Sequence, residues 1–289
     1  MSNFLRFILS VFFLYATLFY TAEQAHATEQ EAELQPALWQ VEYQGSTSYL
    51  FGSVHIGKAS WYPLPATVTD AFKQSTSLIV ELNTLTHGEE VQQAMALPSG
   101  ITLKQKLAAN TYKKLEQYAL AYGVPIKAFE QLKPWAAATI AAVLPYMKQG
   151  LSPVFGIDLH FINAATKQGK NIVELETVAF QLNMLEQMFK DESAFVQLLD
   201  APSGDAKALV EYWEAGDMEN LDRLTLAQIS PQQLDLLLYN RNRQWVSQLK
   251  KMLVNNQSYF MVVGAAHLTG QNGVPALLAA QGIKVKRIN

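Results

Sequence analysis

Two histidines occupy matching positions near opposite ends of the sequence. Each follows a run of apolar residues and lies three residues after a glycine, His55 after Gly52 and His267 after Gly264. An apolar run that ends at glycine predicts a buried strand, and open α/β sheets bind ligands at the carboxyl ends of their strands. The two Gly-x-x-His motifs therefore predict either one shared site or two separate histidines satisfied beneath loops.

A carboxylate at a third strand end favours a shared site. Glu81 follows the apolar residues 78–80, and burying its charge is costly unless it is paired or bound to a cation. His55, Glu81 and His267 would suit a divalent metal such as manganese, cobalt or zinc. That metal would lower the pKa of a bound water and supply a hydroxide nucleophile. The alternative for Glu81 is a surface acid.

Other acids could serve such a site. Asp158 lies at the start of a predicted helix, where it would either cap the helix or act as an auxiliary acid. His160, two residues later, faces another side of that helix and is expected to pack. Glu174 and Glu176 lie on the same side of an extended segment. They could form a general acid/base pair, or lie on a solvated strand edge.

Two arginines flank Asn242 in the predicted helix 231–253. Buried guanidinium groups at Arg241 or Arg243 would suit the anchoring of a carboxylate or the stabilisation of an oxyanion. An exposed helix face is the alternative for both residues.

The elements that must position these residues alternate between strands and helices. Strand–helix–strand succession is the unit of a parallel sheet. We therefore predict an α/β fold with a central mixed, mostly parallel sheet flanked by helices. The predicted strands are 39–43 and 48–51, joined by a turn at 44–47, then 78–83, 171–175, 259–263 and 283–288.

The predicted helices include an insertion at about residues 85–150, where Pro134 occupies a first helical position. We interpret residues 28–289 as one domain that contains this insertion. The predicted helices outside it are 66–74, 156–167, 178–189, 206–220, 231–253 and 274–280.

Residues 1–27 have the features of a secretory signal peptide. A basic Arg6 precedes the apolar residues 7–20, and Ala25-His26-Ala27 fits a cleavage site. The apolar run is shorter than the ~20 residues of a spanning helix, although an uncleaved anchor is the alternative. We expect an exported protein, periplasmic or secreted, with no membrane span after cleavage.

The composition excludes some chemistry. The chain has no cysteine, so thiolate catalysis and thiolate metal ligands are excluded, and a metal would need imidazole and carboxylate ligands. A formal net charge of −3 gives no indication of nucleic-acid binding.

The leucine-rich helix 231–253 could provide a homodimer surface.

The sequence resembles the TraB/PrgY/GumN family, in particular its exported bacterial branch, over nearly all of residues 28–289. The order and spacing of several short segments together carry this resemblance. The matching segments are 51–57 (FGSVHIG), 63–65 (PLP), 80–83 (VELN), 133–135 (KPW), 156–158 (GID), 175–177 (LET), Arg241-Asn242 with Trp245, and 263–270 (VGAAHLTG).

The resemblance implies a fold related to the Tiki proteases, the erythromycin esterases and the ChaN-like proteins. It also implies a divalent-metal hydrolase site at His55, Glu81 and His267, with Arg241 and Asn242 as supporting polar residues. In the Tiki branch the activity is metal-dependent peptide cleavage, with manganese or cobalt favoured. One departure is Asn83, where the family usually has aspartate, and its missing charge puts activity in question.

Together these features predict an exported metal-dependent hydrolase acting on a peptide or a small ester or amide. The arginine would orient the substrate, and Asp158, Glu174 or Glu176 would move protons. Two alternatives remain on the same fold: a non-catalytic protein that binds and sequesters peptides, and an esterase that needs no metal and uses histidine as general base.

Overall fold

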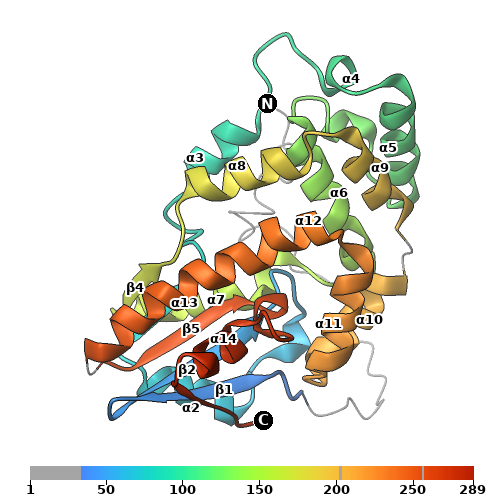
Figure 1. Cartoon of the computed structure of the whole chain (residues 1–289). Coiled ribbons are helices and arrows are strands. Elements are labelled where there is room, and N and C mark those ends of the chain that lie inside the picture. Colours follow the sequence, from blue (N-terminus) through green and yellow to red (C-terminus); the bar gives the residue numbers. More distant parts are fainter. Residues whose placement is uncertain (1–33, 202–203, 256) are drawn as a thin grey trace.

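The computed structural model describes residues 34–201, 204–255 and 257–289. In these residues one sheet carries helices on both faces, and further helices lie beyond one end of it (Figure 1). The sheet has the order β4-β3-β5-β2-β1-β6. Its strands are β1 (Leu38–Tyr43), β2 (Ser46–Ser53), β3 (Ser77–Val80), β4 (Asn171–Glu174), β5 (Tyr259–Gly264) and β6 (Lys284–Arg287).

Four neighbouring strands make the parallel part of the sheet. β5 pairs in parallel with β2 and β3, and β3 pairs in parallel with β4, whereas β1 is antiparallel to both β2 and β6. The predicted α/β fold with a mixed, mostly parallel sheet is confirmed. Ser53 pairs with Gly264, so the two Gly-x-x-His segments leave the sheet side by side.

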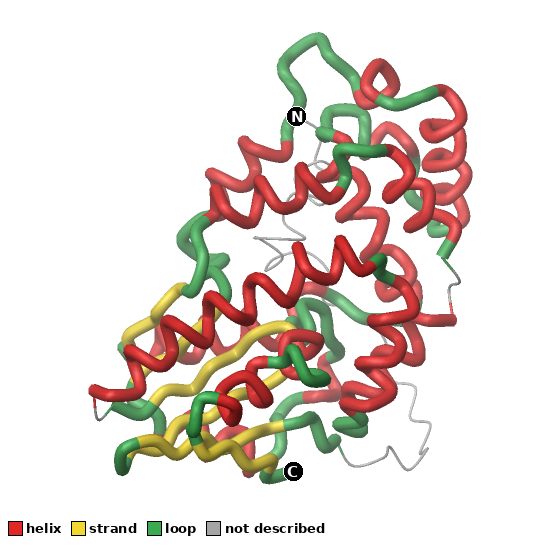
Figure 2. Tube along the Cα trace, viewed as in Figure 1, coloured by secondary structure: helices red, strands yellow, loops and turns green. Residues whose placement is uncertain are grey.

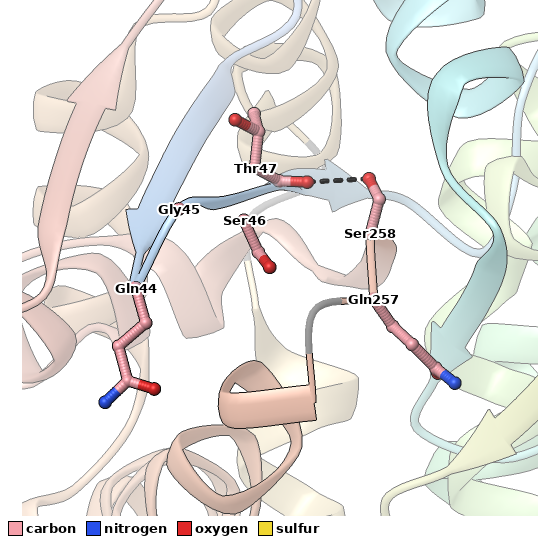
Figure 3. A pocket seen from close by; sticks show the side chains of 6 residues that line it. All are labelled: Gln44, Gly45, Ser46, Thr47, Gln257 and Ser258. Atoms are coloured by element: carbon pink, nitrogen blue, oxygen red, sulfur yellow. Dashed lines mark hydrogen bonds between the residues drawn. The ribbon is translucent and has the colours of Figure 1, made fainter.

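The opposite end of the sheet holds the β1–β2 hairpin. Its turn is only Gln44-Gly45, shorter than the predicted 44–47, and both residues have positive φ (48° and 86°), as a tight two-residue hairpin requires. A polar surface pocket lies here, where Ser258 Oγ donates to the Thr47 carbonyl at 2.6 Å (Figure 3). This pocket lies at the far end of β2 and β5 from the histidines.

Helices cover both faces of the sheet (Figure 2). One face packs on α2 (Ala66–Gln74) and α7 (Ile157–Gln168) through a cluster that includes Phe51, Phe161 and Phe260. The other face packs on α13 (Asn240–Met252) and α14 (Val274–Ala280). Alternate residues of β5 point to the two faces, which holds the sheet between two apolar layers.

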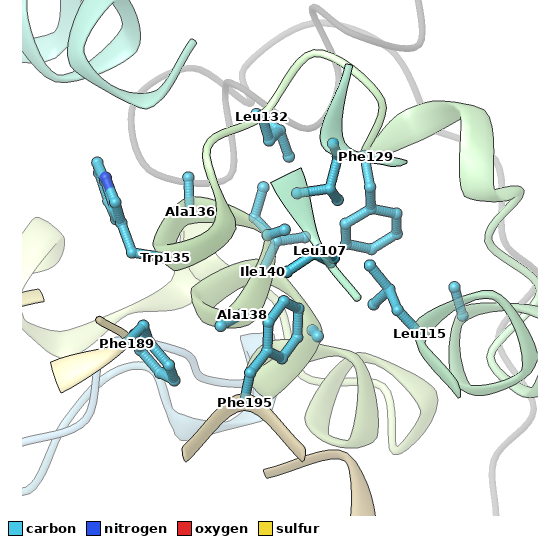
Figure 4. Packing of buried hydrophobic residues seen from close by; sticks show 14 of the residues in the cluster. Leu107, Leu115, Phe129, Leu132, Trp135, Ala136, Ala138, Ile140, Phe189 and Phe195 are labelled. Atoms are coloured by element: carbon cyan, nitrogen blue, oxygen red, sulfur yellow. The ribbon is translucent and has the colours of Figure 1, made fainter. Parts of the chain in front are cut away.

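A helical lobe lies beyond the carboxyl ends of β3 and β4 (Figure 1). Its helices share one apolar cluster, with Phe129, Ile140 and Phe195 near its centre and Trp135 at its edge (Figure 4). Pro134 is the first residue of α6. The lobe consists of α3 (Gly88–Met95), α4 (Leu103–Lys106), α5 (Ala109–Ala121), α6 (Pro134–Lys148), α8 (Val178–Met188) and α9 (Glu192–Asp200).

Two predicted helices are interrupted. The single helix predicted at 206–220 is wrong: α10 (Gly204–Glu214) and α11 (Met218–Gln228) are separated at Gly216, whose φ of 64° ends the first helix. The helix predicted at 231–253 contains α12 (Pro231–Leu234), a π-helical turn (Asp235–Tyr239) and α13. Helix α9 was not predicted.

Every helix within residues 34–201, 204–255 and 257–289 is too short or too polar to cross a bilayer. The predicted signal peptide, residues 1–27, lies outside the described residues.

Candidate functional site

Three adjacent strand ends position the two histidines and Glu81. β2 ends at Ser53, β3 ends at Val80 and β5 ends at Gly264, and β5 lies between the other two. His55 and Glu81 follow two residues and one residue after their strands, and His267 lies in the short 3₁₀ helix Ala265–Leu268. The sheet order thus brings residues more than 200 positions apart to one edge.

His55 forms a pair with Asp158. Asp158 lies in the first turn of α7; its Oδ2 is 2.8 Å from His55 Nδ1, and its Oδ1 accepts a hydrogen bond from Ser53 Oγ at 2.7 Å. The His55 side chain is 71% exposed. Asp158 raises the pKa of His55, an effect that surrounding water screens. Among the described residues, the hydrogen bond of this exposed ring is made through Nδ1, and Nε2 is its other nitrogen.

His267 has the same ring atom engaged but is buried. Its Nδ1 is 2.6 Å from Asn242 Oδ1, and the Asn242 amide donates to the carbonyls of His267 and Asn272. Since Oδ1 can only accept, Nδ1 of His267 carries the proton and Nε2 carries the lone pair. Burial lowers the pKa of His267 to about 3, so the ring is neutral at pH 7. The Trp245 ring packs against it, 4.3 Å between centroids.

Glu81 is ionised although it is buried. Its Oε1 accepts a hydrogen bond from the Gly264 backbone at 2.8 Å, and its Oε2 accepts one from Arg241 Nη2 at 2.5 Å. Burial alone would raise the pKa of Glu81, but Arg241 and the nearby His267 lower it to about 2. Oε1 lies 3.9 Å from Nε2 of His267.

Arg241 links the acids to His267. Its Nε and Nη2 donate to the two oxygens of Glu176 at 2.7 and 2.8 Å, and Nη2 also donates to Glu81. Its Nη1 donates to the Leu237 carbonyl at 2.9 Å and lies 3.1 Å from His267 Nε2. Burial lowers the pKa of Arg241, but Glu81 and Glu176 raise it further, which keeps the guanidinium charged.

Glu176 positions this arginine. Besides Arg241, its Oε1 accepts a hydrogen bond from Trp245 Nε1 at 3.0 Å and its Oε2 accepts one from Gln181 Nε2 at 3.0 Å. Both oxygens are therefore engaged in holding neighbours. Gln181 was not predicted as a site residue. Trp245 was named only among the segments of the family resemblance, although its spacing of four residues from Arg241 indicates one helix face.

Glu174 does not pair with Glu176. Its Oε1 accepts a hydrogen bond from the Asn83 backbone at 2.5 Å and lies 3.1 Å from His87 Nε2. The Asn83 side chain turns back to its own loop, where Oδ1 accepts from the Leu85 backbone at 3.2 Å. An aspartate oxygen could accept the same hydrogen bond. In this structure the residue that replaces the family's usual aspartate therefore forms part of a turn.

The predicted site residues thus fall into two neighbouring groups. Glu81, Glu176, Arg241, Asn242 and His267 form one connected, buried network, and His55 with Asp158 forms an exposed pair. Ser53 pairs with Gly264 across β2 and β5, so the two groups leave neighbouring strands side by side. Ser53 was missed, although it lies within the first Gly-x-x-His motif. His160 stacks on Tyr62, 4.6 Å between ring centroids.

The donor set fits a divalent metal in its chemistry. Both imidazoles have Nδ1 held by an oxygen, which presents Nε2 as ligands in metal sites do. Glu81 Oε1 and His267 Nε2 lie 3.9 Å apart, whereas two ligands of one tetrahedral zinc ion lie about 3.5 Å apart, so the two side chains would have to move closer to share a metal. Among the described residues, however, no three acidic, histidine or cysteine side chains are gathered closely enough to hold a metal.

Sequence comparison identifies the family of this chain. A model of the TraB/PrgY/gumN family matches residues 37–287. The chain belongs to the TraB/PrgY/gumN family. The match includes both Gly-x-x-His segments, Glu81 and the helix that carries Arg241. No solved structure matches the chain significantly.

Relatives of this TraB/PrgY/gumN chain include bacterial and animal proteins. It is 28% identical over 236 residues to "Uncharacterized protein YbaP" of Shigella flexneri, which covers 80% of this chain and 87% of that protein. It is 23% identical over 348 residues to "Metalloprotease TIKI homolog" of Amphimedon queenslandica, covering 96% of this chain and 66% of that protein. It is 23% identical over 303 residues to "Metalloprotease TIKI2" of Danio rerio, and the match covers 83% of this chain and 58% of that protein.

Proposed function

We propose that this chain is a metal-dependent hydrolase of peptides or of small esters or amides. In this proposal His55, Glu81 and His267 hold a manganese, cobalt or zinc ion. The observation that carries the proposal is that Asp158 and Asn242 engage Nδ1 of the two histidines at adjacent strand ends, so Nε2 is the ring nitrogen that each histidine could offer to a metal. Nε2 of His267 lies 3.1 Å from Arg241 Nη1 in this structure. Distant relatives named as metalloproteases support the same reaction class.

The protein residues have distinct roles in this proposal. A bound divalent metal would supply a water of lowered pKa and would polarise the substrate carbonyl. Asp158 and Asn242 hold the two imidazole rings in the required orientation. Glu176 holds Arg241, whose charge keeps Glu81 ionised. Glu176 therefore acts as a positioning residue, because both of its oxygens accept hydrogen bonds from neighbours.

The proposal is tested by metal content. We would purify the chain without an affinity tag and compare wild type with His55→Ala, Glu81→Ala and His267→Ala by elemental analysis. About one divalent metal per chain in wild type, lost in all three variants, is expected. His87→Ala is the matched control: this histidine contacts Glu174 at the end of β4, and its loss should leave the metal content unchanged.

Hydrolysis is tested in the same proteins. A peptide library incubated with manganese or cobalt should be cleaved by wild type and not by the three variants. Metal content and cleavage that are unchanged in both His55→Ala and His267→Ala would reject the proposal. Tight binding of an uncleaved peptide that chelators do not affect would favour a sequestering protein instead.

One observation favours a second candidate, an esterase that needs no metal. Arg241 Nη1 faces the lone pair of His267, and the exposed His55 is paired with Asp158, as a histidine general base often is. This candidate predicts ester hydrolysis that survives chelation and is lost in His55→Ala. Activity lost on chelation and restored by manganese would exclude it.

We also propose that the protein is exported, to the periplasm or outside the cell, after removal of residues 1–27. N-terminal sequencing of the protein recovered from the expressing cells tests this. Cleavage after Ala27 supports export, whereas an intact N-terminus in a membrane fraction indicates an anchor.

A further inference from the structure

Arg241 is a buried cation in contact with two of the three proposed metal ligands. It is 5% exposed, and it contacts both Glu81 and His267. We propose that Arg241 is a resident counter-cation that competes with the metal for His267 and thereby sets the metal affinity of the site. This inference rests on the proposed function, because it concerns the same ligands.

Every N–H group of the Arg241 guanidinium has an acceptor. An arginine has five N–H donors, and Arg241 has five acceptor contacts: two on Glu176, and one each on Glu81, Leu237 and His267. No N–H remains for a substrate carboxylate or an oxyanion. The role predicted from sequence, orientation of the substrate, would require one of these contacts to break.

Arg241 and a metal would need the same nitrogen of His267. Because Asn242 holds Nδ1, the lone pair on Nε2 is the atom that a metal would need, and Arg241 Nη1 lies 3.1 Å from it. One lone pair cannot bind a metal and accept that hydrogen bond at once. Metal binding therefore requires Arg241 to release His267.

Arg241 contacts Glu176 through both carboxylate oxygens but Glu81 through one. Glu176 holds the guanidinium by two charge-assisted hydrogen bonds, so the side chain stays anchored when it releases the neutral His267. On Glu81 only Oε2 contacts Arg241, whereas Oε1 accepts a single backbone hydrogen bond and faces His267. The metal and Arg241 can thus share Glu81, one on each oxygen, but they compete at His267.

The test compares metal affinities by isothermal titration calorimetry of manganese chloride into chelator-treated protein. Arg241→Gln removes the competing cation, and we expect it to bind manganese at least tenfold more tightly than wild type. Arg243→Gln is the matched control, because this arginine lies on the same helix and contacts Asp235 at the surface. It should bind like wild type.

A second variant guards against misfolding. Arg241→Gln leaves Glu176 without its counter-charge, so we add the double variant Glu176→Gln/Arg241→Gln, which removes both charges and keeps all three proposed ligands. The increase in melting temperature on adding manganese, measured for each protein, should be larger in both Arg241 variants than in wild type.

The outcomes separate this inference from the proposed function. Manganese binding that is unchanged or weaker in the double variant, with binding retained in wild type, overturns the competition and leaves the metal site standing. Absence of binding to every protein overturns both. Manganese binding to the Arg241 variants but not to wild type also supports competition, and would mean that Arg241 prevents metal binding in the wild-type protein.

Discussion

The two Gly-x-x-His ends differ in how they hold their histidines. At the end of β2, His55 is exposed and its Nδ1 faces a carboxylate, Asp158. At the end of β5, His267 is 4% exposed and its Nδ1 faces an amide, Asn242. The carboxylate favours a charged ring at His55, whereas burial and the charge of Arg241 favour a neutral ring at His267.

This difference separates a solvent-facing half of the site from a structural half. The His267 half belongs to a network that ties β5, α13 and the start of α8 together through Arg241 and Glu176. In the His55 half, the side chains of Ser53 and His55 connect the end of β2 to Asp158 in the first turn of α7. Substitutions in the buried half should therefore affect stability much more than substitutions in the exposed half.

The largest effect is expected at Arg241. Arg241→Gln leaves Glu81 and Glu176 buried without a counter-charge, which should lower the free energy of unfolding by about 3–5 kcal/mol. Urea denaturation followed by circular dichroism measures this. Arg243→Gln, at an exposed ion pair, should cost less than about 1 kcal/mol. Equal losses in the two variants would show that the buried network does not stabilise the fold.

Asn242 should show the next largest effect. Asn242→Leu leaves the His267 N–H and two backbone carbonyls without partners, each a buried polar group whose loss costs about 1–3 kcal/mol if water cannot reach it. We expect a total loss of about 3 kcal/mol, measured in the same urea experiment. Metal affinity should fall about 10–100-fold, because the ring is no longer oriented. An unchanged affinity would mean that His267 is not a ligand.

Much of this comparison could be predicted from local sequence patterns. Apolar runs ending at glycine located β2 and β5, and helix 66–74 has the predicted bounds. The pairing of Arg241 with Glu81 and Glu176 could not be predicted, because it depends on β5 lying between β2 and β3 and on the way α13 crosses that sheet. One signal was available: Arg241, Trp245 and Leu249 recur every four residues, which indicates a buried face.

Other differences have local causes that the patterns did not reveal. The apolar spacing of 206–220 suggests one helix, but Gly216 adopts a left-handed conformation and turns the chain between α10 and α11. The missing charge at Asn83 suggested a lost ligand, whereas its side chain makes a turn that aspartate could also make. A backbone conformation decided the outcome at Gly216, and a hydrogen bond within its own loop decided it at Asn83.

Gly57, two residues after His55, and Gly264 of the second motif offer a test that leaves charges untouched. In Gly57→Ala the new Cβ would lie 2.2 Å from the Phe155 carbonyl oxygen and 2.7 Å from the Trp61 ring, which forces the backbone to shift. We expect a loss of about 1–3 kcal/mol in the free energy of unfolding. In Gly264→Ala the nearest atoms are 3.4 Å or more away, so stability should change little. A Gly57→Ala variant as stable as wild type would show that the loop after His55 can shift at little cost in free energy.

The smallest effect on stability is expected at Asp158. Asp158→Asn keeps a hydrogen-bond acceptor for His55 but removes the charge that raises its pKa. Because the ring is exposed, the loss of stability should stay below about 1 kcal/mol.

The pH dependence of that small effect has a definite sign. A raised pKa in the folded state stabilises the protein below the unfolded value, about 6.5, and this contribution is lost as the pH rises through the folded value of about 9. Wild type should therefore lose stability relative to Asp158→Asn between these pH values. Nuclear magnetic resonance titration of His55 should show a lower pKa in the variant. If the pKa of His55 is the same in both proteins, the carboxylate does not charge this ring, and the contrast between the two histidines is one of burial alone.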